Sequence, residues 1–159
     1  VINQIITDAH SSIQGNDIVL SMIRKITPTF GQSAAYLFTT DNAIKSSTQG
    51  AYTSASDFAV STNVFQTVLD DAVTDVVIQD NGIGDLHLYQ IINGAKVKNP
   101  TAIGTVDYDT GRVSFTTYVY SVTPSLQVTC VMSDRSIDIS LNKFISIDGN
   151  DIDLTLQSV

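Results

Sequence analysis

The sequence predicts a mainly β protein: an antiparallel β-sandwich or a meander of hairpins, with at most one or two short helices. Val, Ile, Thr, Tyr and Phe recur in short runs, and these residues suit a pleated, partly buried surface. Asn, Asp, Gly and Ser separate the runs at short intervals, as residues of tight turns do. The 159 residues, 43% of them hydrophobic, suffice for one domain with a buried core, so residues 1–159 are interpreted as a single β-rich domain.

The first predicted element is ambiguous between strand and helix. In DIVLSMIRKITPTF, residues 17–30, the apolar positions of 17–26 fit a strand, and they also fit a short helix capped by Asp17 and ended by Pro28. The density of β-branched residues favours a strand. We expect it to form a long hairpin with FGQSAAYLFTTDNAI, turning near Gly31.

A polar segment follows. Residues 45–57, KSSTQGAYTSASD, are rich in Ser, Thr and Gly, which predicts a loop rather than a linker between domains. The next residues, FAVSTNVF, have the composition of a strand.

From residue 73 onward the chain reads as strand, turn and strand in succession. Three hairpins are predicted, each centred on Gly with Asp or Asn: VVIQ-DNGIGD-LHLYQII, IGTVD-YDTG-RVSFTTYVY and FISI-DGND-IDLTLQ. LQVTCVMS, residues 126–133, is a further strand. Asn93-Gly94 predicts another turn, and Pro100 argues against a regular central strand at its position.

Charge and composition exclude several classes of function. The net charge is −8, and the eight Lys and Arg residues are scattered, whereas nucleic acids and anionic membrane surfaces select basic patches. No apolar stretch approaches the length of a membrane-spanning helix. The single cysteine, Cys130, lies in an apolar run and is interpreted as a small buried residue, which fits assembly in a reducing cytoplasm. The N-terminus lacks both Met and a signal-peptide pattern, so we interpret the chain as a C-terminal fragment of a longer protein or as a processed product.

Asp109-Thr110-Gly111 invites comparison with the active-site loop of an aspartic protease. That chemistry needs two carboxylates sharing a proton in an apolar setting. The position after the Gly holds Arg112, where a small residue is needed, and no second Asp-Thr-Gly or Asp-Ser-Gly occurs. Pairing Asp107 with Arg112 instead makes residues 108–111 a type I turn with Gly111 left-handed. We therefore predict a turn, and no catalytic residue.

Metal and acid–base sites are likewise not predicted. Two acidic turns, Asp80-Asn81 with Asp85 and Asp148 with Asn150-Asp151, lack the spacing and the distal Glu of a calcium-binding loop. The two histidines, His10 and His87, are far apart in sequence. Alternation places His87 on the face opposite Leu86 and Leu88, which predicts a solvent-facing side chain. No zinc, phosphate-loop or nucleophile-elbow motif occurs.

Aromatic residues raise the possibility of a sugar-binding face. The candidates are Tyr52, Phe58, Phe65, Tyr89, Tyr108, Phe115, Tyr118 and Tyr120. The chain has no Trp, and core or cross-strand packing explains most of these residues.

The order of the motifs is more specific than any one of them. A Tyr/Phe strand before NAI precedes SST and DFAVSTNVF, which are followed by VVIQDNGIGDLHLY, IGTVDYDTGRVSF and SDRSIDISLNKFISIDGNDIDLTL. Over about residues 36–157 this series resembles the C-terminal part of the baseplate wedge subunit of T-even-like contractile-tailed phages.

The resemblance implies a structural role and not an enzymatic one. Such a protein would form a homodimer, join neighbouring wedges, contact other baseplate wedge proteins, and reside in the tail baseplate of the virion after assembly in the host cytoplasm. It implies no cofactor. Residues 45–65 and exposed strand edges are the expected contact regions. The alternative is a β-sandwich carbohydrate-binding or adhesin module.

Overall fold

The described residues form an all-β fold. The computed structural model describes residues 20–48, 50–122 and 125–133, and within them it contains nine strands and no helix. The strands are β1 (Ser21–Ile26), β2 (Ser33–Thr39), β3 (Val60–Thr62), β4 (Phe65–Leu69), β5 (Ala72–Asp80), β6 (Asp85–Ile92), β7 (Ala95–Asp107), β8 (Arg112–Tyr118) and β9 (Leu126–Val131). The predicted mainly β fold class is confirmed. Among the described residues no helix is long and apolar enough to span a membrane.

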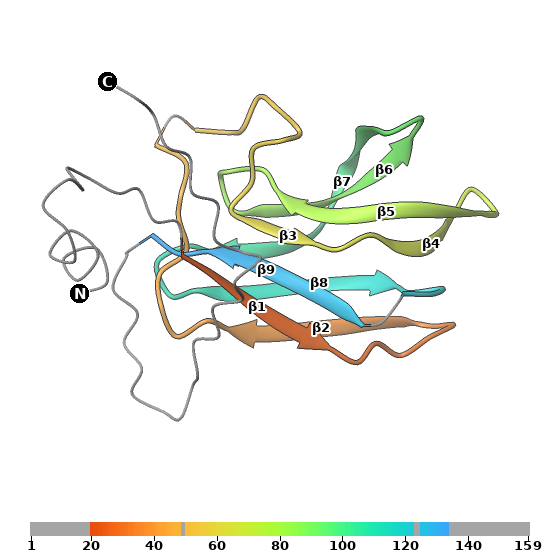
Figure 1. Cartoon of the computed structure of the whole chain (residues 1–159), viewed down its shortest axis with the longest axis horizontal. Coiled ribbons are helices and arrows are strands. Elements are labelled where there is room, and N and C mark those ends of the chain that lie inside the picture. Colours follow the sequence, from red (N-terminus) through yellow and green to blue (C-terminus); the bar gives the residue numbers. More distant parts are fainter. Residues whose placement is uncertain (1–19, 49, 123–124, 134–159) are drawn as a thin grey trace, which may run out of the picture.

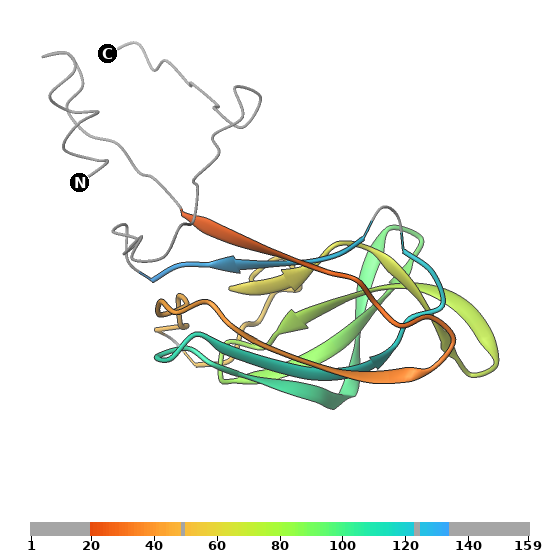
Figure 2. The same cartoon turned by 90° about the horizontal axis from the view of Figure 1, so that it is seen from below.

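All pairings between these strands are antiparallel, in a single sheet with the order β1-β9-β3-β5-β6-β7-β8-β2, and β4 pairs with β5 beside this path. The sheet curls on itself, so that β1 and β9 lie above β2 and β8 in Figure 2. The enclosed space is the main hydrophobic core. Its buried members include Ile44, Phe65, Ile78, Leu86, Val113, Leu126 and Val128.

The first strand is correctly predicted, but its partner is not. Residues 21–26 form a strand, which excludes a helix there, while residues 17–19 lie outside the described part of the chain. The predicted hairpin around Gly31 is wrong, because β1 pairs with β9 and β2 pairs with β8. The chain does turn at Gly31, which has a φ of 75°. Pro28, which has no N–H for a ladder, is buried in the connection between β1 and β2. Figure 1 shows this connection leading from β1 to β2.

The local turns of the later hairpins are as predicted. β5 and β6 flank residues 81–84, and Asn93-Gly94 joins β6 to β7 with both residues at positive φ. Pro100 does lie within β7. The register of β7 against β6 shifts on either side of His87, and Pro100 falls in that irregular stretch, where a missing N–H is tolerated. The predicted FISI-DGND-IDLTLQ hairpin lies outside the described residues.

The segment predicted as a polar loop covers part of the sheet. Residues 45–48 and 50–57 contain no helix or strand. Tyr52 N donates a hydrogen bond to the Asn81 carbonyl (2.7 Å), and the Lys96 ammonium lies over the Phe58 ring. The loop and the residues after it therefore pack against the outer side of β5–β7, which explains why both faces of β5 and β6 are buried.

Candidate interaction surface

The Asp109 loop is a hairpin turn. Asp107 lies opposite Arg112, and Val106 lies opposite Val113, in the register expected from the sequence. The Asp107 carboxylate accepts hydrogen bonds from the backbone N–H groups of Asp109 and Thr110 (3.1 Å each). The hydrogen bond from the Thr110 backbone is the largest cause that lowers the pKa of Asp107. The exposed Asp109 side chain therefore sits at the tip of an ordinary turn.

Gly111 has a second role that the sequence does not reveal. Its φ is 69°, as the turn requires. It is also buried, and a Cβ at this position would collide with the Thr40 hydroxyl and the Asn42 carbonyl. Thr40 N donates a hydrogen bond to the Gly111 carbonyl (3.0 Å). The β7–β8 turn is thus fixed against the chain that follows β2.

The acidic turn at residues 80–85 holds its polar groups in internal hydrogen bonds. The Asn81 side-chain oxygen accepts from the N–H groups of Ile83 and Asp85 (3.0 Å each), and its amide donates to the Asp85 carboxylate (2.9 Å). Asp80 points elsewhere, and no group of three potential metal ligands occurs among the described residues. The second acidic turn, at Asp148, Asn150 and Asp151, lies outside those residues, as does His10.

Asp80 is the one fully buried carboxylate among the described residues, and sequence reasoning assigned it no such role. It accepts hydrogen bonds from the N–H groups of Ala59 and Val60 (2.8 Å each) and from the Tyr108 hydroxyl (2.7 Å). Burial, followed by the hydrogen bond to Asp80, raises the pKa of Tyr108 far above its ordinary value. With three donors engaged, Asp80 ties β5 to the entry of β3 and to the β7–β8 turn.

His87 is buried, so the prediction of a solvent-facing side chain is wrong. It is 6% exposed, and its Nδ1 lies 3.0 Å from the Asn99 carbonyl oxygen. Leu86 and Leu88, on the opposite face of β6, are buried too. The prediction assumed one solvated face, as is common in antiparallel sheets, but both faces of this part of β6 are buried.

Cys130 and most of the candidate aromatic residues are buried or partly buried. Cys130 is buried, and its burial raises the thiol pKa to about 12, which leaves it unreactive near neutral pH. Of the eight aromatic residues considered for a sugar-binding face, only Tyr120 is exposed. The Tyr36 ring packs against the Phe115 ring in a tilted arrangement, with 5.3 Å between ring centroids. The eight candidates therefore do not form a joint exposed platform.

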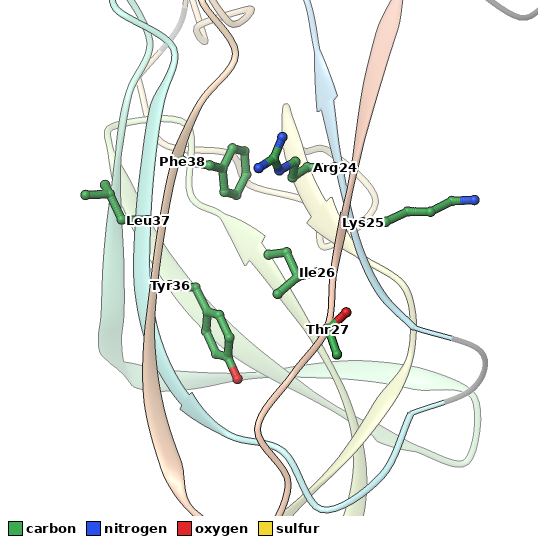
Figure 3. Close-up of a pocket in the computed structure, with 7 residues that line it drawn as sticks. All are labelled: Arg24, Lys25, Ile26, Thr27, Tyr36, Leu37 and Phe38. Atoms are coloured by element: carbon green, nitrogen blue, oxygen red, sulfur yellow. The ribbon is translucent and has the colours of Figure 1, made fainter.

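The strand edges expected to carry contacts are β1 and β2, the two ends of the strand order. Of the predicted contact range 45–65, Val60–Thr62 forms the inner strand β3 between β9 and β5, so it presents no free edge. Between β1 and β2 lies an open cavity of about 260 Å³, which we call the β1–β2 gap. Its lining residues are Arg24, Lys25, Ile26, Thr27, Tyr36, Leu37 and Phe38 (Figure 3).

The lining side chains are divided between the inside and the outside of the gap. In Figure 3, Arg24, Ile26, Tyr36 and Phe38 point into the space between the strands, whereas Lys25 and Leu37 point away from it. The outward side of β1 and β2 carries large exposed apolar residues, Ile23 and Leu37, and Phe30 is exposed in the connection between the strands. We call these three residues together the apolar edge surface, and they are the candidate interaction surface. Ile23 lies on the same side of β1 as Lys25, and Lys25 and Leu37 point to opposite sides in Figure 3, so the set is divided between the two outer sides of the strands.

Comparisons of the chain with protein-family models, with curated proteins and with solved structures found no match.

Proposed function

We propose that this chain is a structural protein of a phage tail baseplate, a wedge component that forms homodimers and joins neighbouring wedges. Its other partners are baseplate wedge proteins, and it is assembled in the host cytoplasm and retained in the virion. The role is mechanical and requires no catalysis or cofactor. The resemblance in the order of the hairpin motifs supports this proposal, and two of those motifs, VVIQDNGIGDLHLY and IGTVDYDTGRVSF, are hairpins among the described residues.

The observation that carries the proposal is the apolar edge surface. Ile23 is 59% exposed, Leu37 61% and Phe30 55%, and all three belong to the edge strands or their connection. Isolated exposed apolar residues are ordinary. Three of the ten large exposed apolar side chains among the described residues lie here, beside strand edges that can also pair with another chain, and association would remove their area from water.

The rest of the fold gives such a surface a fixed position. Asp80 ties three segments together through its hydrogen bonds, and Gly111 fits the β7–β8 turn against the chain after β2. A ring of subunits needs each contact surface at a constant angle to the next, because a symmetric contact must be self-complementary. A closely packed β domain with few internal degrees of freedom satisfies that need.

Sedimentation equilibrium of the full chain tests the proposal. We expect a dimer at high micromolar concentration, and weaker association in Ile23→Asp and Leu37→Asp, because a charge at the interface has to be desolvated. Ile83→Asp is the matched control, since Ile83 is 60% exposed but lies in the β5–β6 turn. A monomeric wild-type chain, or equal weakening by all three variants, would contradict the proposed surface.

A further inference from the structure

The outer edge of β2 has no partner strand among the described residues. β2 ends the strand order, and an open cavity lies between it and β1. Thr40 N donates to the Gly111 carbonyl, in continuation of the register of β2 against β8. Because backbone groups alternate along a strand, the N–H and C=O groups of Ala35 and Leu37 point away from β8. They bond to no described residue, so β2 offers a ladder to another strand.

Other unpaired edges of the sheet carry features that oppose pairing. Natural proteins commonly protect edge strands with charged residues, with proline or with a covering segment. β1 carries Arg24 and Lys25. The first part of β7 pairs with β6 but not with β8, and it contains Lys96, Lys98 and Pro100. A second chain would therefore meet charge or a missing N–H at each of these two edges.

The edge of β2 lacks every one of these features. β4, which pairs only with β5, is covered in part, because Gln66 N donates to the Ser121 carbonyl (2.8 Å). β2, with the sequence SAAYLFT, contains no charged residue and no proline, and its pairing with β8 runs without a register shift. Residues 26–40 as a whole contain no Asp, Glu, Lys or Arg. A regular, uncharged edge strand of this kind favours pairing with another strand.

We propose that β2 pairs in antiparallel fashion with β2 of a second copy of this chain, across a two-fold axis at Tyr36. The inference rests on the proposed homodimer and specifies the strand that makes its backbone contact. In this register all seven residues of β2 have a partner. Ala35 lies opposite the partner's Leu37, and Ser33 lies opposite the partner's Thr39. A shift of the axis by one residue either way would leave two residues of each strand unpaired.

The outward side chains of β2 suit this register. Ser33, Ala35, Leu37 and Thr39 are all exposed, and Leu37 points away from the β1–β2 gap (Figure 3). The proposed pairing sets the small Ala35 side chain beside the large side chain of the partner's Leu37, which is 61% exposed in the single chain. Such cross-strand contacts stabilise an antiparallel pair. The contact is self-complementary, as a two-fold interface must be.

Charge favours β2 over β1 as the contact between two copies. Each chain has a net charge of −8, so two copies repel each other at long range. A β2 pair brings no charged residue to the ladder. A β1 pair would bring Arg24 and Lys25 of both copies onto one short ladder, where like charges oppose the pairing. A second copy therefore meets less electrostatic opposition at β2.

Paired charge changes on β2 test the register. In the proposed dimer, Ala35→Lys/Leu37→Lys places ammonium groups opposite each other, and Ala35→Glu/Leu37→Glu places carboxylates opposite each other. Sedimentation equilibrium of the full chain measures the dissociation constant. We expect each variant alone to dimerise at least about tenfold more weakly, because like charges are juxtaposed. An equimolar mixture should recover most of the affinity, because each ammonium group then lies opposite a carboxylate.

A matched control shows whether the effect belongs to β2. Ala95→Lys/Val97→Lys makes the same change at two exposed residues of β7 with the same spacing, and it should leave dimerisation unchanged. An equal loss in this control would overturn the assignment to β2. A mixture that stays as weak as its two components would overturn the antiparallel register.

A proline variant tests the ladder without added charge. Ala35→Pro removes an N–H that points away from β8, and proline is tolerated at such a position of an edge strand. It should weaken dimerisation, and an unchanged dissociation constant would overturn the backbone pairing. A wild-type dimer that all the β2 variants leave intact would overturn this inference alone and leave the proposed homodimer in place. A monomeric wild-type chain would overturn both.

Discussion

The inner strands β5 and β6 and the edge strands β1 and β2 are built from similar β-forming residues but have opposite surroundings. Val76 to Asp80 are all buried on β5, because the core lies on one side and the segment around Phe58 on the other. On β1 no residue is fully buried, and Ile23 is among the most exposed apolar residues. The difference shows that local composition predicts a strand, whereas its neighbours determine whether the strand stabilises the fold or offers a surface.

The largest expected effect comes from removing the anchor at the end of β5. Asp80→Ala leaves the N–H groups of Ala59 and Val60 and the Tyr108 hydroxyl without their acceptor. We expect a loss of about 3–5 kcal/mol in the free energy of unfolding, since several buried donors lose a charged partner. Chemical denaturation measures it. Asp80→Asn retains an acceptor oxygen and should lose clearly less; equal losses would argue against the hydrogen-bond explanation.

Glycine replacement separates a packed turn from an open one. Gly111→Val should cost about 2–4 kcal/mol, because a positive-φ penalty and a collision with Thr40 and Asn42 act together. Gly94→Val, with φ of 79° and nothing near a Cβ, should cost only about 1–2 kcal/mol. Both follow from denaturation midpoints. If the two variants were equally stable, the close packing around Gly111 would be refuted.

Isoleucine truncation compares the two regions directly. Ile78 is a buried core residue of β5, and Ile23 is exposed on β1. We expect Ile78→Ala to cost about 2–5 kcal/mol through the cavity that it leaves, and Ile23→Ala to change the stability of the monomer by less than about 0.5 kcal/mol. Thermal unfolding at low protein concentration gives both values, and a large effect of Ile23→Ala there would place that residue inside the fold.

The smallest expected effect concerns the exposed turn of the β7–β8 hairpin. The pKa of Asp107 is lowered below its ordinary value of 3.8, chiefly by the hydrogen bond from the Thr110 backbone. A lowered pKa in the folded state means that the stabilisation is present above the ordinary value and is lost as the pH falls through the folded value. Asp107→Asn should therefore make the melting temperature slightly less sensitive to acid. An unchanged acid dependence would mean that this carboxylate contributes nothing to it.

Local turn chemistry was predictable from the sequence, and long-range pairing was not. The register of the β7–β8 hairpin and the turn at Asn93-Gly94 follow from residues within a few positions of each other. The pairing of β1 with β9 joins segments about 100 positions apart, and no local pattern encodes it. The expected hairpin at Gly31 failed for that reason.

The sequence predicted that exposed strand edges would carry contacts, but it did not indicate which strands have exposed edges. Exposed strand edges were expected, but assigning them to β1 and β2 required the strand order. The burial of His87 and Asp80 was not predictable for the same reason. Both side chains contact segments that are distant in sequence, and the alternation within one strand does not reveal such contacts. Burial on both faces of a strand removes the alternation on which such predictions rest.

The proposed contrast between a fixed interior and an edge surface that associates is tested most directly by amide NMR spectra of the full chain over a range of concentrations. We expect concentration-dependent shifts at Ile23, Phe30 and Leu37, and unchanged signals for Val77 and Tyr89, which are buried on β5 and β6. Spectra that do not change with concentration, or shifts centred on β5 and β6, would contradict the assignment of the interaction surface to β1 and β2.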